Sequence, residues 1–308
     1  MTSTRQNEPT QLLSRTAIRQ SAKAAALSGA TALVALAIAL SGPIAEYYFE
    51  SGKPWLALIG ICFAVFAVLF LKQREHALRK RSATIQEQFD CDVLQLPWNP
   101  IAVEEPPAPE PVAGAPEGTT SDAESQDSQQ SGYSPEADAV PLVAARLIRQ
   151  RANLYSDSEL RRPYAVLLWM AALAVPVVLI VWTLASGRDL AALLIVFAAG
   201  LPFVLWTGQE ARSQNDAADR VQRLRKCADD IWKTLIAEVL RQPAWERIDE
   251  HRYLDASRTL QDQIYLHRVE SSKVPDWFYK QSRERSERQT SGLVRELVEE
   301  FQRAKHGR

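Results

Sequence analysis

Four long apolar runs stand out along the chain. None of them contains Asp, Glu, Lys or Arg, and they cover about Ala24 to Gly42, Trp55 to Leu71, Tyr164 to Ala185 and Leu190 to Thr207. An α-helix rises about 1.5 Å per residue, so a run of this length crosses the hydrocarbon core of a bilayer, which is about 30 Å thick. The pattern therefore predicts four transmembrane helices.

The four runs form two pairs. Residues 43–54 join the first two runs and residues 186–189 join the last two, so each pair is expected to be a tight helical hairpin. The first run follows a basic stretch, as in a signal peptide, but it is too long for one and a second span follows closely. We therefore expect the first span to remain uncleaved.

Basic residues flank the hairpins on one side only. The segments before and after each hairpin are rich in Lys and Arg, whereas the hairpin turns hold only Lys53 and Arg188. The positive-inside rule then predicts that both termini and the middle segment are cytoplasmic.

The polar parts of the chain also read as helices, with one exception. Apolar residues at helical spacing from Leu78 to Leu96 predict an amphipathic stalk that Pro97 ends. Residues 104–141 are rich in proline, acidic residues, Ser and Gln and contain no Lys or Arg, which is typical of a disordered linker.

The C-terminal part of the chain is expected to be helical. Apolar residues at alternating spacings of three and four from Ala217 to Val239 predict a coiled-coil-like seam. Two further helices are expected over 245–267 and 284–305, with an aromatic cluster, Val274–Tyr279, between them.

The predicted fold class is an all-α membrane protein, with four transmembrane helices as two hairpins and a cytosolic helical assembly. The expected parts are a cytosolic N-terminal segment (1–23), the first hairpin (24–71), the stalk (72–103), the linker (104–141), an Arg-rich helix (142–163), the second hairpin (164–207) and a C-terminal helical domain (208–308).

The composition and the motifs limit the functions that the chain is expected to perform. The chain is 46% hydrophobic and 24% charged with a net charge of −1, which argues against DNA or RNA polymers as partners. It has three scattered cysteines, scattered histidines, and no P-loop, GxSxG or HExxH motif. Asp90-Cys-Asp92 has the DxD form of a metal site but lies at helical spacing, and we interpret it as a solvated helix face. We expect no enzyme activity, no metal and no cofactor.

The spans favour assembly over transport chemistry, because none holds an ionisable residue for a proton relay. Small side chains recur every four residues in the first span, in the rows Ala24, Ser28, Ala32 and Thr31, Ala35, Ala39. These rows fit either a close helix contact or simple lipid-compatible filler. Pro176 and Pro202 interrupt the third and fourth spans, which fits either a gating hinge or a static kink.

Basic and aromatic residues of the polar segments are the types that a nucleotide pocket requires, because guanidinium groups pair with phosphate and aromatic rings stack on bases. The candidates for phosphate and polar contact are Arg151, Asn153, Arg161, Arg162 and Arg268, and those for stacking are Trp98, Trp277 and Tyr279. The alternative is that Arg161 and Arg162 serve only membrane topology and that Trp277 seals a small helical core.

Three segments carry a family resemblance: Ile85–Asn99 (IQEQFDCDVLQLPWN), Arg151–Tyr164 (RANLYSDSELRRPY), and Leu260–Arg268 (LQDQIYLHR) followed by Pro275–Tyr279 (PDWFY). In this order around four spans, they resemble the SMODS-associating four-transmembrane effectors of bacterial CBASS-type antiphage defence. The resemblance implies an inner-membrane effector that binds a cyclic oligonucleotide from a neighbouring nucleotidyltransferase and then damages the lipid bilayer.

The expected function is therefore cyclic-nucleotide-activated membrane permeabilisation in abortive infection. Four kinked spans without ionisable residues make a poor pore alone, so a homo-oligomer is expected. Two alternatives remain open at this point. One is a membrane-anchored scaffold or receptor whose 217–239 region recruits a protein partner, and the other is a constitutive small-solute channel.

Overall fold

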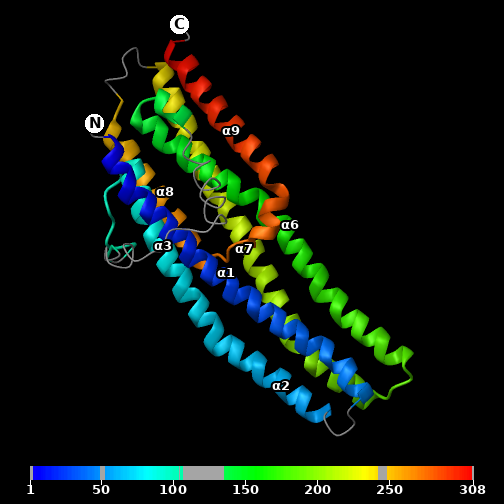
Figure 1. Cartoon of the computed structure of the whole chain (residues 1–308). Coiled ribbons are helices and arrows are strands. Elements are labelled where there is room, and N and C mark those ends of the chain that lie inside the picture. Colours follow the sequence, from blue (N-terminus) through cyan, green and yellow to red (C-terminus); the bar gives the residue numbers. More distant parts are fainter. Residues whose placement is uncertain (1–2, 49–52, 104, 107–134, 242–247, 307–308) are drawn as a thin grey trace. The chain divides into compact units, whose positions relative to one another are not determined.

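The computed structural model describes residues 3–48, 53–103, 105–106, 135–241 and 248–306, and all regular structure in these ranges is helical. In chain order the elements are α1 (Ser3–Tyr48), α2 (Lys53–Phe66), the π-helical turn η2 (Ala67–Leu71), α3 (Lys72–Leu94), the 3₁₀ turn η4 (Pro135–Ala139), α6 (Leu142–Ala185), α7 (Leu190–Arg241), α8 (Glu250–Glu270) and α9 (Asp276–His306), as shown in Figure 1. Four helices are long and apolar enough to cross a membrane, which confirms the predicted fold class.

The chain divides into two compact units. One comprises Ala22–Leu78 and Arg161–Asp216, and we call it the membrane unit because it contains the four apolar runs. The other comprises Met1–Ser21, Arg79–Leu160 and Ala217–Arg308, and we call it the head unit. α1, α3, α6 and α7 each contribute residues to both units. α1, α6 and α7 each contain apolar and polar sequence in one helix, and the polar helix α3 follows the apolar α2 and η2 directly. The Arg-rich helix and the third span, expected as separate parts, are both contained in α6.

Small residues set the packing of the membrane unit. A Cβ atom on Gly60 of α2 would lie 3.2 Å from Ala199 Cα and from the Ala198 carbonyl oxygen of α7, so the two backbones approach closely there. Ala35 and Ala39 of α1 are buried against Phe203 of α7. The row that contains these two alanines is therefore a close helix contact, as small residues allow between membrane helices.

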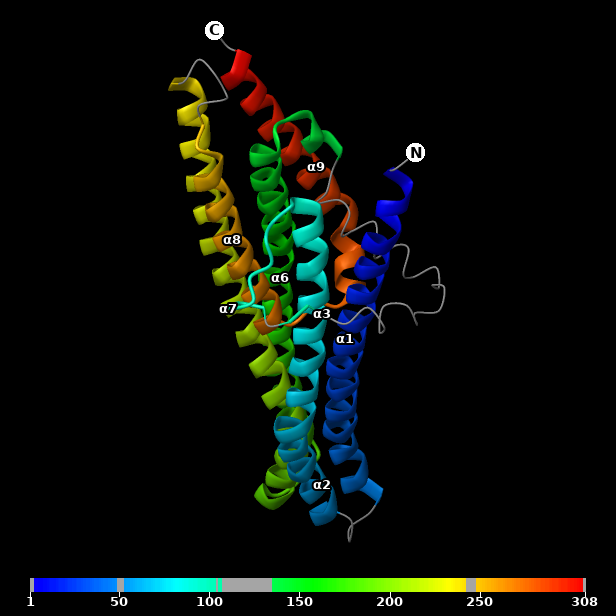
Figure 2. The ribbon, with the colours of Figure 1, turned by 90° about the vertical axis from the view of Figure 1, so that its left-hand side faces the viewer.

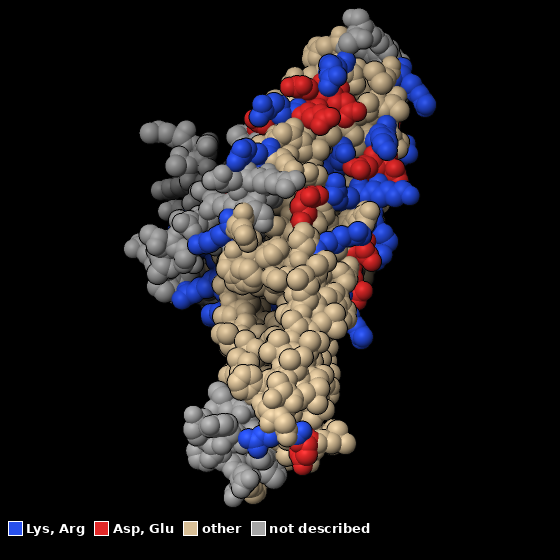
Figure 3. All heavy atoms as spheres, turned by 90° about the vertical axis from the view of Figure 1, so that its right-hand side faces the viewer, with Lys and Arg blue, Asp and Glu red and all other residues tan. Residues whose placement is uncertain are grey.

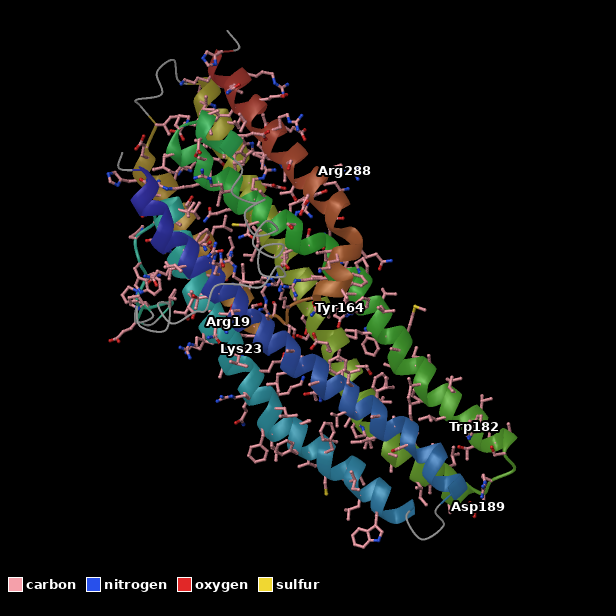
Figure 4. All side chains as sticks on the ribbon, in the orientation of Figure 1. Arg19, Lys23, Tyr164, Trp182, Asp189 and Arg288 are labelled. Atoms are coloured by element: carbon pink, nitrogen blue, oxygen red, sulfur yellow. The ribbon has the colours of Figure 1, made fainter. Side chains whose placement is uncertain are left out.

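The outer surface of the membrane unit is apolar. Leu173, Val178 and Trp182 of α6 are each about 60% exposed or more. Figure 3 shows one face of the unit as a broad area without charged side chains, and Figure 4 places Trp182 close to Asp189 in the turn between α6 and α7. Such a surface would be anomalous in water but is the one a bilayer requires.

The main core of the head unit is formed by α6, α7 and α9. Trp232 of α7 and Leu147 of α6 are fully buried in it with Phe301 of α9. Trp232 Nε1 also donates a hydrogen bond to Glu300 Oε2 at 2.8 Å. The seam predicted over 217–239 is a buried face of α7, but it packs on helices of the same chain. It does not form an exposed docking surface in this structure.

Two local expectations need correction. The predicted disordered linker lies largely outside the described residues, but its last part is ordered as η4, where Ala137 is fully buried because it packs into the main core of the head unit. The aromatic cluster was expected to precede the last helix, yet α9 begins at Asp276. Trp277 and Phe278 therefore lie in the first turn of α9, where their rings meet edge to face at 5.6 Å.

Candidate functional site

Charged and amide side chains lie buried in the head unit between α3 and α8, which run side by side in Figure 2. Glu87 and Asp90 of α3 are both at 0% exposure. They are three residues apart and therefore lie on the same face of the helix. Because a buried carboxylate is costly unless it is paired, the partners of these two groups define the site.

Arg258 of α8 is the main partner of Glu87. Its Nη2 donates to Glu87 Oε1 at 2.5 Å and to Asp262 Oδ1 at 2.8 Å, and its Nη1 donates to the carbonyl oxygen of Pro97 at 3.1 Å. Nη1 also lies 3.2 Å from Cys91 Sγ. The guanidinium thus uses its fork of donors to fix α8 to α3 and to the segment that follows α3.

Gln261 and Arg268 of α8 hold Asp90. Gln261 Nε2 donates to Asp90 Oδ2 at 2.8 Å and to Glu87 Oε2 at 2.9 Å. Arg268 Nη1 donates to Asp90 Oδ2 at 2.5 Å, and Gln86 Nε2 donates to Asp90 Oδ1 at 3.1 Å. Every carboxylate oxygen of the buried pair therefore accepts a hydrogen bond.

α6 joins this cluster from a third side. Gln150 Nε2 donates to the Ser257 carbonyl oxygen at 2.9 Å and to Gln261 Oε1 at 3.2 Å. Asp157 Oδ2 lies 2.7 Å from His267 Nε2. We call these groups the polar network; its members are Gln86, Glu87 and Asp90 of α3, Gln150 and Asp157 of α6, and Ser257, Arg258, Gln261, Asp262, His267 and Arg268 of α8.

Burial dominates the electrostatics of the network. Burial raises the pKa of Glu87, with a further rise from the charge of Asp90, and the hydrogen bonds from Arg258 and Gln261 offset only part of this rise. Burial acts to lower the pKa of Arg258, but the hydrogen bond and charge of Glu87 outweigh it and leave that pKa above its ordinary value. Burial also raises the pKa of the Cys91 thiol to about 12. Cys91 is thus a protonated thiol and not a nucleophile at neutral pH.

One arrangement in the network has the residue types of a hydrolase triad. His267 contacts Asp157 through Nε2, and its Nδ1 lies 3.1 Å from Ser271 Oγ. However, Ser271 is only 6% exposed and stands at the C-terminal cap of α8. A helix C-terminus carries a partial negative charge, which would repel the oxyanion that forms in a hydrolase reaction and would not stabilise it. The geometry favours a structural link between α6 and α8. Among the described residues, no group of three or more His, Cys, Asp or Glu side chains could hold a metal ion.

The residues predicted from the sequence to contact a nucleotide are divided between the two units. Arg151, Asn153, Arg268, Trp98 and Trp277 belong to the head unit. Arg151 pairs with Asp229 at 2.6 Å and stacks over the Trp232 ring at 5.7 Å. Asn153 is half-buried, and Trp277 is 59% exposed. The side chain of Tyr279 lies outside the described residues.

Arg161 and Arg162 belong to the membrane unit. Arg161 is 6% exposed and its Nη1 donates to Gln214 Oε1 at 2.9 Å, whereas Arg162 is exposed. Of the predicted set, the structure brings only Arg268 into the polar network. Trp98 borders the same helix pair, since it packs half-buried on the cluster of Cys91, Leu94 and Leu96, on which Leu254 of α8 also packs.

Sequence reasoning missed most of the polar network. Asp90 was interpreted as part of a solvated face, but it is fully buried while Asp92 is exposed, because only Asp90 faces α8. A signal was present in the pattern: Gln86, Glu87 and Asp90 lie at helical spacing with the apolar residues Ile85 and Phe89, on the side of the helix that is buried. Polar residues on a predicted apolar face indicate a paired buried cluster.

Comparison with known families identifies the family of the chain. A family model described as the SMODS-associating 4TM effector domain matches residues 2–297, so the chain belongs to this family. Its members are multi-pass membrane effectors of the CBASS type. Neither a curated protein nor a solved structure matches the chain. The segments 85–99, 151–164 and 260–268, which carried the resemblance in the sequence, supply most of the polar network.

Proposed function

We propose that this SMODS-associating 4TM effector is activated by a cyclic oligonucleotide that binds the head unit, and that the activated protein assembles into homo-oligomers that permeabilise the bacterial inner membrane. In this proposal both termini are cytoplasmic and the nucleotide comes from a neighbouring nucleotidyltransferase. A charged nucleotide does not enter the hydrocarbon core, so it must act on the polar part of the chain.

One observation carries the proposal. The polar network ties together three helices, and two of them, α3 and α6, run on into membrane spans without a break. A ligand that changes how α3, α6 and α8 are held therefore acts on the same helices that cross the membrane. A ligand shifts such an equilibrium by its difference in affinity for the two states.

Arg268 is the proposed centre of ligand contact. Its side chain is 20% exposed and pairs with the buried Asp90, so a phosphate that binds Arg268 competes with Asp90 for the same guanidinium. Arg151 has a similar position, since its side chain is 15% exposed and pairs with Asp229. We propose that phosphate binding exchanges these partners, and that the release of Asp90 from Arg268 loosens α3 from α8.

The remaining candidates complete the site in this proposal. Trp98, Trp277 and Tyr279 stack on bases and Asn153 makes a polar contact, whereas Arg161 and Arg162 belong to the membrane unit and are not assigned to this site. The prolines Pro176 in α6 and Pro202 in α7 then act as hinges in the spans, because each removes a backbone hydrogen bond from its helix.

The test is dye release from liposomes that contain the purified full-length protein, across a panel of cyclic dinucleotides and trinucleotides. We expect release with one nucleotide and not with the others. Arg268→Ala should reduce that release at least tenfold, whereas Arg295→Ala, an exposed position on α9, should leave it unchanged. Silence across the panel with folded, inserted protein would overturn the proposal in favour of a scaffold. Release without any nucleotide would indicate a constitutive channel.

A further inference from the structure

Exposed cations of the membrane unit gather at the end of the unit where its apolar runs meet polar sequence. The first and third runs begin at this end, and the second and fourth runs finish there, as Figure 1 shows. Each of the four helices carries an exposed cation close to its run: Lys23 of α1, Arg74 of α3, Arg162 of α6 and Arg212 of α7. We call these four residues the basic belt.

The carboxylates at this end are placed differently. Among the described residues of the membrane unit, they are Glu75, Glu210 and Asp216. Glu75 and Glu210 are only 7% and 6% exposed, and Glu210 Oε1 accepts a hydrogen bond from Gln214 Nε2 at 2.9 Å. Of the three, Asp216 alone is exposed. The outer surface at this end is therefore positively charged, although the whole chain has a net charge of only −1.

Membrane topology alone does not require this arrangement. The positive-inside rule depends on the number of Lys and Arg residues in the flanking segments, and not on the helix faces that carry them. Arg161 and Arg162 illustrate the difference. Arg161 is 6% exposed and donates to Gln214 inside the unit, whereas Arg162 is exposed. The belt cations thus face the surroundings of the bundle at the level where its apolar surface ends.

The surface beside the belt indicates which anions lie there. Phe70, Val166 and Leu205 are one or two helical turns nearer to the middle of the spans than the belt residue that follows or precedes them in the chain, and they are 59%, 58% and 40% exposed. Lipid acyl chains cover apolar surface of this kind, so the phosphates of the same lipids lie at the level of the cations. A soluble anion is not held at this level by any apolar contact.

We propose that the basic belt binds anionic phospholipids, so that lipids of net negative charge surround the membrane unit preferentially in the leaflet at this end. Lys and Arg attract an anionic membrane surface, and the attraction decreases within a Debye length. A zwitterionic headgroup has no net charge and gains less from the belt. This inference goes beyond the proposed function and does not depend on it, because it requires only that the chain spans a bilayer.

The test identifies the lipids that the full-length protein retains. Protein reconstituted in vesicles of equal parts phosphatidylethanolamine and phosphatidylglycerol is extracted in mild detergent, and the retained lipids are quantified by mass spectrometry. At about 0.1 M salt, where the Debye length is about 10 Å, we expect phosphatidylglycerol to exceed phosphatidylethanolamine about threefold. At about 1 M salt the Debye length is about 3 Å, and the two lipids should be retained almost equally.

Two double variants remove the same number of charges at different places. Arg74→Gln combined with Arg212→Gln removes two cations of the belt and should reduce the excess of phosphatidylglycerol to about half. Arg295→Gln combined with Arg303→Gln removes two exposed cations of α9 in the head unit and should leave the excess unchanged. Because the net charge changes equally, a difference between the two variants reports the position of the cations and not the total charge.

Three results would overturn the inference. They are equal retention of the two lipids by the wild type at low salt, an excess of phosphatidylglycerol that does not change with salt, and equal loss of the excess in the two double variants. If the belt variant does not fold, the salt dependence of the wild type still tests the inference. Failure of the proposed function is distinguishable, since dye release without response to nucleotide leaves the ratio of retained lipids unaffected.

Discussion

The membrane unit and the head unit of this chain are stabilised by different means. In the membrane unit, backbones approach at small residues such as Gly60 and Ala39, and the contacts that set the packing are apolar. In the head unit, an apolar core lies beside a network in which Glu87 and Asp90 are fully buried. The difference follows from solvent. In lipid, packing and not hydrophobic burial drives association, whereas in water burial of apolar surface provides the energy and leaves room for a costly, specific polar cluster.

This comparison bears on function. A packed apolar bundle changes by overall shifts of its helices, but a buried charge network has a defined alternative, in which one cation exchanges its partner. The head unit is thus the better place for a switch, and the membrane unit is the better place for its effect.

The largest expected effect comes from breaking the network at its best-connected residue. Arg258→Met should destabilise the protein by about 3 to 5 kcal/mol, because it leaves the buried Glu87 without its cation. The measurement is thermal unfolding of the full-length protein in detergent at pH 8, followed by circular dichroism. Arg295→Met on the exposed face of α9 is the control and should change little. A small effect of Arg258→Met, equal to that of the control, would contradict the role assigned to the network.

The next effect tests the packing of the membrane unit. Gly60→Leu should destabilise it by about 1 to 3 kcal/mol, because even a Cβ atom meets the α7 backbone at 3.2 Å. Gly29→Leu is the matched control, since a Cβ atom at Gly29 of α1 meets nothing within 4 Å. The measurement is the detergent concentration or temperature at which each variant loses helicity. Equal loss in the two variants would show that close approach does not set the packing.

A third prediction joins the network to activation. Asp90→Asn keeps the shape of the side chain but weakens its hold on Arg268, so less ligand is needed to separate the two helices. The nucleotide concentration for half-maximal dye release should fall about fivefold. Asp92→Asn, two residues away and exposed, should not change it. An equal shift in both variants would remove Asp90 from the mechanism.

The sequence predicted the membrane part far better than the site. A helix that crosses the bilayer is the main stable structure for an apolar run without charges. The spans in α1, α2, α6 and α7 therefore follow directly from hydropathy. Of the residues that the sequence proposed for ligand contact from their chemical types, Arg268 belongs to the polar network and Trp98 lies beside it, and their contact with a ligand stays a prediction. The pairing of Arg258 with Glu87 was not predictable, because it joins residues 171 positions apart and depends on how α8 packs on α3. The spacing of arginine and glutamate along a helix is the same whether their side chains face solvent or pair with a neighbouring helix, so the sequence pattern does not distinguish the two cases.

The smallest expected effect is a pH dependence that differs in sign from ordinary acid unfolding. The pKa of Glu87 is raised in the folded protein above its ordinary value of 4.5, so the folded state binds this proton more tightly than the unfolded chain. Its contribution to stability is therefore complete below that ordinary value and is lost as pH rises through the pKa of the folded state. Thermal unfolding from pH 4.5 to 8 should show wild type losing stability relative to Glu87→Gln as pH increases. A difference between the two proteins that stays constant with pH, or that grows in favour of the wild type, would mean that Arg258 and Gln261 outweigh burial at this carboxylate.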